Sequence, residues 1–238
     1  MDYYSQFGQD KFIDEYVTKG KQGGTFVEIG AYDGVTYSNT LFFERHRGWS
    51  GACIEPIPAR FQLLQQNRKA NCHQTCLSDK AGMVEFSVVE GEGGVGMLSA
   101  MTSVITQQHA QRIAQEQAHM KTISVPAVTF ESVMQEDGIS QIDYISIDTE
   151  GHEFAILKTI DLARYRPTCL TIEENGRYFA LKRYAAKWGY RAAEKLGSDL
   201  VIVSGATART MRGIGLLNPV NRIRRYTAAA LRRLRLHS

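Results

Sequence analysis

The sequence predicts an α/β fold of the doubly wound kind, with a mainly parallel seven-stranded sheet, an antiparallel final strand and helices on both faces. Three observations predict this fold. Short apolar runs alternate with longer polar segments of helical periodicity, which is typical of βαβ units. Several of these runs end on an acidic residue. The 238 residues, 43% of them hydrophobic, suffice for one sizeable core, so we expect a single domain.

The predicted strands are apolar runs of five or six residues. They occupy 25–29, 51–55, 72–77, 84–89, 123–128, 144–148 and 169–173. The predicted helices lie between them, at 9–18, 38–44, 59–67, 130–135, 153–160 and 177–188. Pro58 is well placed to open the third helix, because proline favours the first helical position. After Gly189, the segments 190–194 and 199–203 predict a hairpin that completes the sheet.

We expect residues 1–205 to form the domain and residues 206–238 to form a basic tail. An insert at 91–122 interrupts the alternation and is too long for an ordinary connection. Long connections often serve as lids or substrate loops, and a surface excursion with a polar helix is the alternative.

The charge is unevenly distributed along the chain. Eight of the 28 basic residues and none of the 25 acidic residues follow Asp199, so the net charge of +3 combines about −5 for residues 1–199 with +8 for the remainder. Such a body does not suit nucleic-acid binding. In the tail, Ile223, Tyr226, Ala230 and Leu234 recur at helical spacing and predict an amphipathic helix with a basic face. Contact with an anionic membrane surface, packing on another subunit and a solvated helix are the three interpretations.

Cysteine spacing and hydropathy indicate the compartment. The four cysteines form no CxxC pair, which favours free thiols over zinc or disulfides. The polar start resembles no signal peptide, and no apolar run approaches the roughly 18 residues that span a bilayer. We therefore expect a cytoplasmic protein, with peripheral membrane association through the tail as an option.

The stretch TFVEIGAYDG at 25–34 predicts the first ligand contact. In an open parallel sheet, ligands bind beyond the carboxyl ends of the strands. Gly30 follows the first predicted strand directly, and without a Cβ atom it permits a tight turn and close approach of a ligand. The spacing is not the GxGxxG of dinucleotide enzymes, which disfavours a nicotinamide dehydrogenase.

The next two predicted strand ends add polar groups. Glu55 lies 25 residues beyond Gly30, about the spacing at which an acidic residue accepts hydrogen bonds from ribose hydroxyls. The third strand is followed by Ser78 and Asp79, which suit an adenine edge. A solvated strand end or a helix cap explains any one of these acids better, but three consecutive strand ends with such groups predict a nucleoside pocket.

The motifs together resemble the FkbM family of S-adenosylmethionine-dependent methyltransferases, over roughly residues 3–205. The resemblance rests on SQFGQD, VEIGAYDG, CIEP, CLSD and, most specifically, DYISIDTEGHE at 143–153. It implies a Rossmann-like methyltransferase fold and S-adenosylmethionine as cofactor. Glu28, Gly30 and Ala31 then line its methionine half, Glu55 holds the ribose, and an amino-terminal flap covers it. The full set of expected cofactor contacts is Gln9, Glu28, Gly30, Ala31, Tyr32, Ser38, Glu55, Pro56, Ser78, Asp79 and Asp148.

The DTEGHE element also provides the expected catalytic residues. Asp148 ends a predicted strand, and Glu150 and His152 precede the following helix. Histidine titrates near neutrality, so His152 is our first candidate for the base that removes a hydroxyl proton. The family likeness implies an O-methyltransferase acting on a sugar, a glycan precursor or a related natural product. N-methylation of an amino sugar or amide, and a cofactor-binding module without catalysis, are the alternatives.

A metal site is a further hypothesis from the same region. Glu174 and Asn175 follow Asp148 by 26 and 27 residues, and their oxygens suit Mg²⁺ or Mn²⁺. The set Asp148, Glu174 and Asn175 is similar to the ligands of metal-dependent catechol methyltransferases, with glutamate in place of an aspartate. Helix capping by Glu174 and Asn175 is the competing interpretation.

Overall fold

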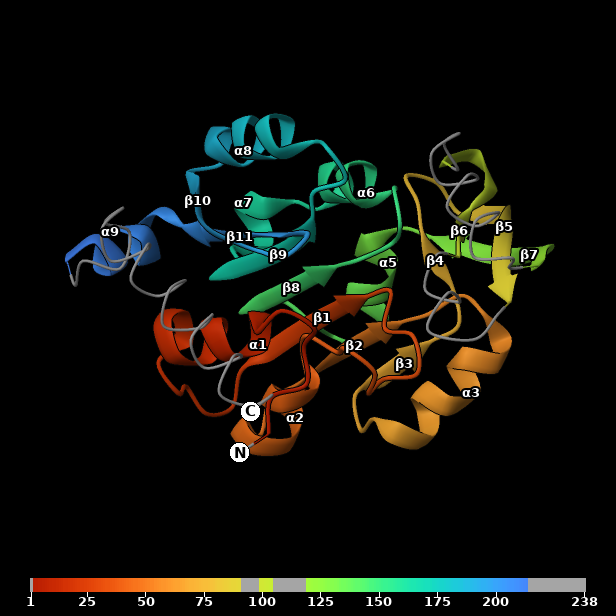
Figure 1. Ribbon diagram of the computed structural model, residues 1–238, viewed down its shortest axis with the longest axis horizontal. Helices are drawn as coiled ribbons and strands as arrows, with labels where there is room; N and C mark the ends of the chain where they lie inside the picture. The colour runs from red at the N-terminus through yellow and green to blue at the C-terminus, as the bar shows by residue number, and fades with distance from the viewer. Residues whose placement is uncertain (1, 91–98, 105–118, 214–238) are drawn as a thin grey trace, which may run out of the picture.

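The computed structural model describes residues 2–90, 99–104 and 119–213 (Figure 1). The predicted tail beyond residue 213 and most of the predicted insert lie outside the described residues. In the part of the chain that the structure describes, no helix is long and apolar enough to cross a bilayer.

The main sheet has seven strands in the order β10-β11-β9-β8-β1-β2-β3. Their bounds are Thr25–Ile29 (β1), Ser50–Ile54 (β2), Asn71–His73 (β3), Tyr144–Ile147 (β8), Cys169–Glu173 (β9), Tyr190–Leu196 (β10) and Asp199–Ser204 (β11). Only β11 runs antiparallel to its neighbours β9 and β10. The predicted mainly parallel seven-stranded sheet with an antiparallel final strand is confirmed. The strand order reverses between β1 and β8, which places a ligand-binding switch point at their carboxyl ends.

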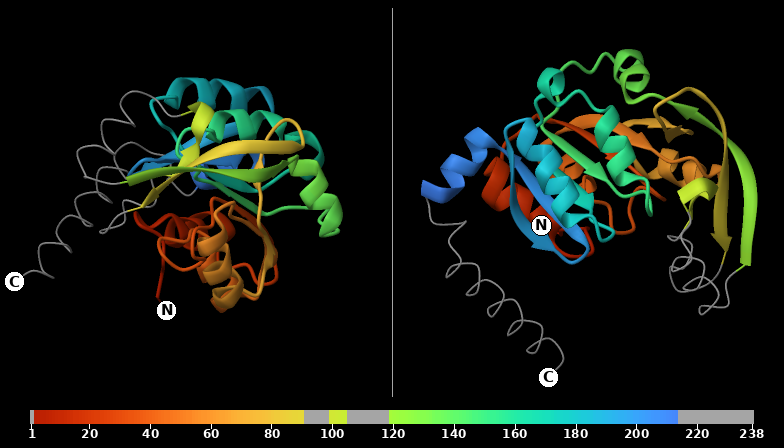
Figure 2. Two further views of the ribbon diagram at one scale, coloured as in Figure 1. Left: turned by 90° about the vertical axis from the view of Figure 1, so that its right-hand side faces the viewer. Right: turned by 90° about the horizontal axis from the view of Figure 1, so that it is seen from above.

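Helices cover both faces of this sheet, as Figure 2 shows in its left view. They are α1 Gln9–Phe12, the π-helix η1 Ile13–Thr18, α2 Leu41–Arg47, α3 Pro58–Asn67, α5 Phe130–Glu136, α6 Glu153–Thr159, α7 Leu162–Tyr165, α8 Tyr178–Lys187 and α9 Gly205–Gly213. The strands alternate, so Val27 and Ile145 pack with α5 to α8. Phe26 and Tyr144 pack on the other face, with residues of α1, η1, α2, α3 and α9. Two apolar layers therefore hold the sheet rigid beneath the strand ends.

A second sheet of four strands lies at one end of the molecule, beside α3 (Figures 1 and 2). It has the order β4-β7-β5-β6, with bounds Cys76–Leu77 (β4), Gly82–Glu90 (β5), Ala100–Met101 (β6) and His119–Val128 (β7), and the 3-10 helix η3 Thr102–Val104 follows β6. The prediction of one strand at 72–77 was wrong, because β3 and β4 belong to different sheets. The chain leaves the main sheet after His73, and the Thr75 hydroxyl donates a hydrogen bond to the Pro126 carbonyl of β7 (2.8 Å).

Candidate active site

A cavity of about 480 Å³ opens at the carboxyl ends of β1, β2, β8 and β9, and its volume lies in the usual range for small-molecule sites. The predicted residues that line it are Gln9, Glu28, Gly30, Ala31, Tyr32, Ser38, Glu55, Pro56, Asp148, Glu150 and His152. Ser78, Asp79, Glu174 and Asn175 do not line it. The structure thus brings together predicted residues from three strand ends, whereas these last four residues lie outside the cavity lining.

Gly30 occupies the closest contact between strand ends. Its φ is 85°, and a Cβ atom there would lie 1.7 Å from the carbonyl oxygen of Asp148. The Gly30 and Ala31 N–H groups both donate to the Ile54 carbonyl (3.0 Å). Only glycine fits this close approach of the turn to the residue that follows β8.

Three non-glycine residues with left-handed backbone angles line the same cavity. Tyr32, Tyr37 and Glu150 have φ of 52°, 55° and 54°. Such conformations cost on the order of 1–3 kcal/mol each and cluster at functional sites, so this observation supports the cavity as the active site.

Glu28, the acid within the first apolar strand, organises the loop below the cavity. Its buried carboxylate accepts hydrogen bonds from the Ser38 and Thr40 hydroxyls, the Asn39 N–H and the Arg68 guanidinium, the last at 2.7 Å. These bonds hold residues 38–40 outside the helix, so α2 begins at Leu41 and the predicted helix start at 38 was wrong. Glu28 therefore shapes the site through the protein groups that surround its carboxylate.

Glu55 lies at the end of β2 and is also buried. Its two carboxylate oxygens accept hydrogen bonds from the backbone N–H groups of Tyr32 (3.0 Å) and Ile57 (2.9 Å). Burial raises the pKa of Glu55 to about 7, against the opposing effects of the Arg60 guanidinium and these two N–H groups. An ionised carboxylate has about four lone-pair sites. Because each oxygen of Glu55 accepts one N–H group, the carboxylate can accept two further hydrogen bonds.

Arg60 is a cavity residue that sequence reasoning missed. Its guanidinium lies over the Tyr32 ring, 4.8 Å from the centroid, and donates to the Ser99 hydroxyl at 2.7 Å. It therefore links α3 to the second sheet beside Glu55. A lone arginine in a polar helix carries no signal that would have predicted this contact.

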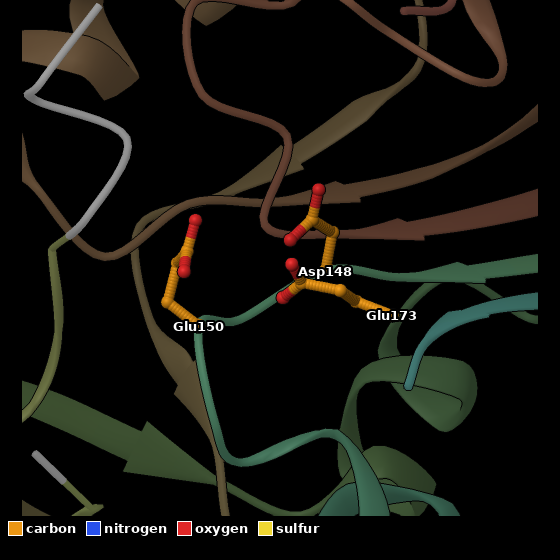
Figure 3. Close-up of side chains that lie close together, drawn as sticks. All are labelled: Asp148, Glu150 and Glu173. Atoms are coloured by element: carbon orange, nitrogen blue, oxygen red, sulfur yellow. The ribbon is translucent and has the colours of Figure 1, made fainter. Parts of the chain in front are cut away.

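Three carboxylates meet at the cavity end of β8 and β9. Ligand oxygens of Asp148, Glu150 and Glu173 all lie within 4.8 Å of one another, and Figure 3 shows Asp148 and Glu150 on the loop after β8 and Glu173 at the end of β9. Asp148 is exposed toward the cavity, whereas Glu150 and Glu173 are half-buried. The protein groups around the Asp148 carboxylate restrict its hydration and raise its pKa, and the negative charges of Glu173 and Glu150 raise it further. When ionised, Asp148 is therefore a stronger base and a stronger hydrogen-bond acceptor than an ordinary aspartate.

His152 precedes α6 and lines the cavity half-buried. Burial lowers the pKa of His152, and the nearby charges of Glu153 and Asp79 oppose this effect. The imidazole is therefore largely neutral at pH 7 and able to accept a proton. Asp79 itself is exposed and does not line the cavity.

The predicted metal ligands Glu174 and Asn175 bind other protein groups and do not line the cavity. Glu174 pairs with the Lys195 ammonium of β10, and the Asn175 amide nitrogen donates to Glu173 and Glu153. The structure instead brings Glu173 to Asp148. Strand alternation carries the signal that was missed, because Glu173 shares its face of β9 with Thr171, which bonds to Ser146 of β8.

The amino-terminal segment closes one side of the cavity. Gln6, Phe7 and Gln9 line it, and the Gln9 amide donates to the Asp199 carboxylate of β11 at 2.9 Å. Phe7 lies on the β10–β11 turn, where a Cβ atom on Gly197 would be 2.2 Å from its ring. Asp199 was not predicted as a site residue, since its place beside the cavity depends on the antiparallel return of β11.

The strand order, the glycine turn after the first strand and the buried acid after the second define the Rossmann-like class of S-adenosylmethionine-dependent methyltransferases. Residues 28–192, more than half of the chain, match the family model described as "Methyltransferase FkbM domain". The chain belongs to the FkbM methyltransferase family. The resemblance inferred from the sequence motifs is thereby confirmed.

Solved methyltransferase structures show a partial likeness at low identity. The METTL16 methyltransferase domain is 9% identical with a TM-score of 0.43, over 82% of this chain and 66% of that chain. A methyltransferase from Pyrococcus furiosus is 13% identical with a TM-score of 0.41, over 86% and 88%. The human methyltransferase 10 domain containing protein is 11% identical with a TM-score of 0.41, over 82% and 80%. This chain thus spans just under two thirds of the first of these chains, and no curated protein sequence matches it significantly.

Proposed function

We propose that this protein transfers the methyl group of S-adenosylmethionine to a hydroxyl group of a sugar, a glycan precursor or a related natural product. The observation that supports a hydroxyl acceptor is that Asp148, whose pKa is raised, and His152, whose pKa is lowered, line the same cavity. A hydroxyl is a weak nucleophile until its proton is removed, and both groups suit that task.

The cavity residues fit the cofactor. We assign both ribose hydroxyls to the Glu55 carboxylate, which lines the cavity, and the turn at Gly30 provides close backbone approach. The negative charges of Asp148 and Glu150 complement the positive charges of the sulfonium and ammonium groups. When bound, S-adenosylmethionine supplies an electrophilic methyl group.

The protein's part in the reaction is orientation and proton removal. Asp148 accepts a hydrogen bond from the acceptor hydroxyl and directs its oxygen at the methyl carbon. His152 takes the hydroxyl proton as the new C–O bond forms and the S–CH₃ bond breaks. The negative charges of Glu153 and Asp79 offset part of the cost that burial imposes on the imidazolium that results.

Product analysis tests this assignment against its alternatives. The protein is incubated with cofactor carrying a ¹³C-labelled methyl group and a panel of sugars, amino sugars and glycan precursors, and NMR identifies the methylated atom. An O-methyl product supports the proposal. A product methylated only on nitrogen, or binding of the cofactor without any turnover, overturns it in favour of N-methylation or a non-catalytic module.

A divalent metal is a second proposal for the same carboxylates. Asp148, Glu150 and Glu173 are the oxygen donors that Mg²⁺ and Mn²⁺ prefer, and such an ion lowers the pKa of a coordinated hydroxyl. The labelled-methyl assay run with EDTA, and again after Mn²⁺ is restored, decides between this ion and proton removal by side chains alone. Full activity in EDTA rejects the metal.

Glu55 predicts a pH dependence of cofactor binding. Only the ionised carboxylate accepts both ribose hydroxyls, and its pKa in the free protein is about 7. We expect affinity for S-adenosylhomocysteine to be highest above pH 7 and to fall, at most tenfold per pH unit, as the pH drops below 7. Calorimetry from pH 5.5 to 8.5 measures this affinity.

Glu55→Gln is expected to weaken binding of S-adenosylhomocysteine at pH 8 and to flatten its pH dependence. Glu131→Gln on α5 is the matched control. A wild-type affinity that is constant between pH 6 and 8 would contradict the ribose assignment.

We further propose that the protein contacts an anionic membrane surface, where a lipid-linked acceptor would be found. On α8, Phe179 is 81% exposed, and the exposed Lys182, Arg183 and Lys187 follow it by three, four and eight residues. No acidic residue occurs between 175 and 193, and the eight arginines after Asp199 extend the same charge in sequence. Exposed aromatic and basic side chains on one helical face are typical of interfacial binding.

Vesicle flotation measures this contact. We expect the full chain to float with phosphatidylglycerol-containing vesicles but not with phosphatidylcholine alone, and to dissociate in high salt. Lys182→Glu with Lys187→Glu is expected to lower the floated fraction, as is Phe179→Ser, whereas Lys80→Glu and Met83→Ser are matched controls. Absence of flotation, combined with a smaller hydrodynamic size after deletion from Pro219 onward, would reject the membrane in favour of subunit packing.

A further inference from the structure

Asn175 lies directly behind the acidic cluster and joins two carboxylates. Its side-chain nitrogen donates to Glu173 at 2.7 Å and to Glu153 at 3.1 Å. Its φ of 40° is left-handed, a conformation that asparagine adopts more readily than most residues. The amide thus uses both of its protons to connect the end of β9 with the start of α6.

Glu153 holds the loop that carries the catalytic candidates. One oxygen of its buried carboxylate accepts hydrogen bonds from the Thr149 N–H (3.0 Å), the Thr149 hydroxyl (3.1 Å) and the Gly151 N–H (2.7 Å). These bonds fix the backbone on both sides of Glu150, which has a left-handed φ of 54°. The other oxygen accepts the bond from Asn175. The Asp148–His152 loop is therefore tied to Glu173 through one continuous chain of hydrogen bonds.

We propose that Glu153 and Asn175 are positioning residues that set how Asp148 and Glu150 lie relative to Glu173 in the acidic cluster. This inference rests on the proposed function, in which these carboxylates orient the acceptor. Neither residue lines the cavity, so each acts through the groups that it holds. Residues of this kind affect turnover, because a displacement of about 1 Å at a reacting group costs up to a hundredfold in rate.

The direction of the hydrogen bond from Asn175 to Glu153 makes the proposal testable. Glu153→Gln retains an oxygen for the three loop donors but turns an amide N–H₂ toward Asn175, which also donates. Asn175→Asp places a third carboxylate between those of Glu153 and Glu173. The double variant Glu153→Gln with Asn175→Asp restores a donor and an acceptor across this one hydrogen bond, in reversed order.

Steady-state kinetics of these variants test the proposal. We expect Glu153→Gln to lower kcat tenfold to a hundredfold, with KM for the cofactor and affinity for S-adenosylhomocysteine within about threefold of wild type. The double variant is expected to exceed Asn175→Asp in kcat. Glu131→Gln, which also removes a hydrogen-bonded carboxylate but on α5, serves as the control. The positioning role would be overturned if the losses in kcat of the two single variants multiply fully in the double variant. It would also be overturned if the loss in kcat equals the fraction of the protein that is unfolded.

A crystal structure of Glu153→Gln provides a readout that does not depend on activity. In the wild-type chain, a carboxylate oxygen of Asp148 lies within 4.8 Å of one of Glu173. We expect the distance between these oxygens to exceed 4.8 Å in the variant. An unchanged cluster would reject the positioning role even if no acceptor is found. Conversely, a wild-type protein that binds the cofactor but methylates no hydroxyl rejects the proposed function alone.

Discussion

Replacing Asp148 with asparagine is expected to lower kcat by two to four orders of magnitude. Losses of about this size are usual when a group that assists proton transfer is removed. The side chain follows β8 at the switch point of the sheet, and its carboxylate faces the cavity beside Glu150 and Glu173. Asparagine keeps the shape of the side chain but loses the charge and one acceptor oxygen. The acceptor hydroxyl would then be held less firmly, and its proton would pass less readily to His152.

The measurement compares kcat and KM for Asp148→Asn, His152→Gln and a control. Asp161→Asn is a suitable control because Asp161 caps α7 through the Ala163 and Arg164 N–H groups, and asparagine also caps helices well. A larger loss in His152→Gln than in Asp148→Asn would support His152 as the proton acceptor. Activity of Asp148→Asn within threefold of wild type would contradict the catalytic role of this residue.

Replacing Gly30 with alanine is expected to destabilise the fold by several kcal/mol and to abolish cofactor binding. The new methyl group would lie 1.7 Å from the backbone oxygen of Asp148, and neither strand end is free to withdraw. A left-handed φ costs a further 1–2 kcal/mol or so for a residue with a Cβ atom. The turn would have to open, and with it the close packing of β1 against the loop after β8.

Gly138→Ala separates the two causes. Gly138 also has a left-handed φ, of 65°, but a Cβ atom there meets nothing within 4 Å. It is therefore expected to lose only the conformational part, about 1–2 kcal/mol. Denaturant unfolding measures both variants, and calorimetry with S-adenosylhomocysteine measures binding. Equal losses of stability for the two variants would show that the contact with Asp148 does not constrain Gly30.

Much of the fold was predictable because neighbouring residues decide it. The apolar runs at 25–29 and 169–173 became β1 and β9 with the predicted bounds, since a buried parallel strand needs a short continuous apolar stretch. The stretch 72–77 was misassigned because its local sequence, CHQTCL, does not show where one strand ends and the next begins. Only the β4–β7 pairing and the Thr75–Pro126 hydrogen bond show where it divides.

The site divides along a similar line. The glycine turn, Glu55 and the DTEGHE loop are local motifs, so the sequence by itself determined the class of reaction and the strand ends that serve it. The tertiary structure alone decided that Glu28 is surrounded by loop hydroxyls and Arg68, that Glu173 rather than Glu174 joins Asp148, and that Asp199 reaches the cavity. The physical reason is that motif spacing follows the backbone, whereas the direction of a side chain and its partners depend on strands and loops far away in sequence.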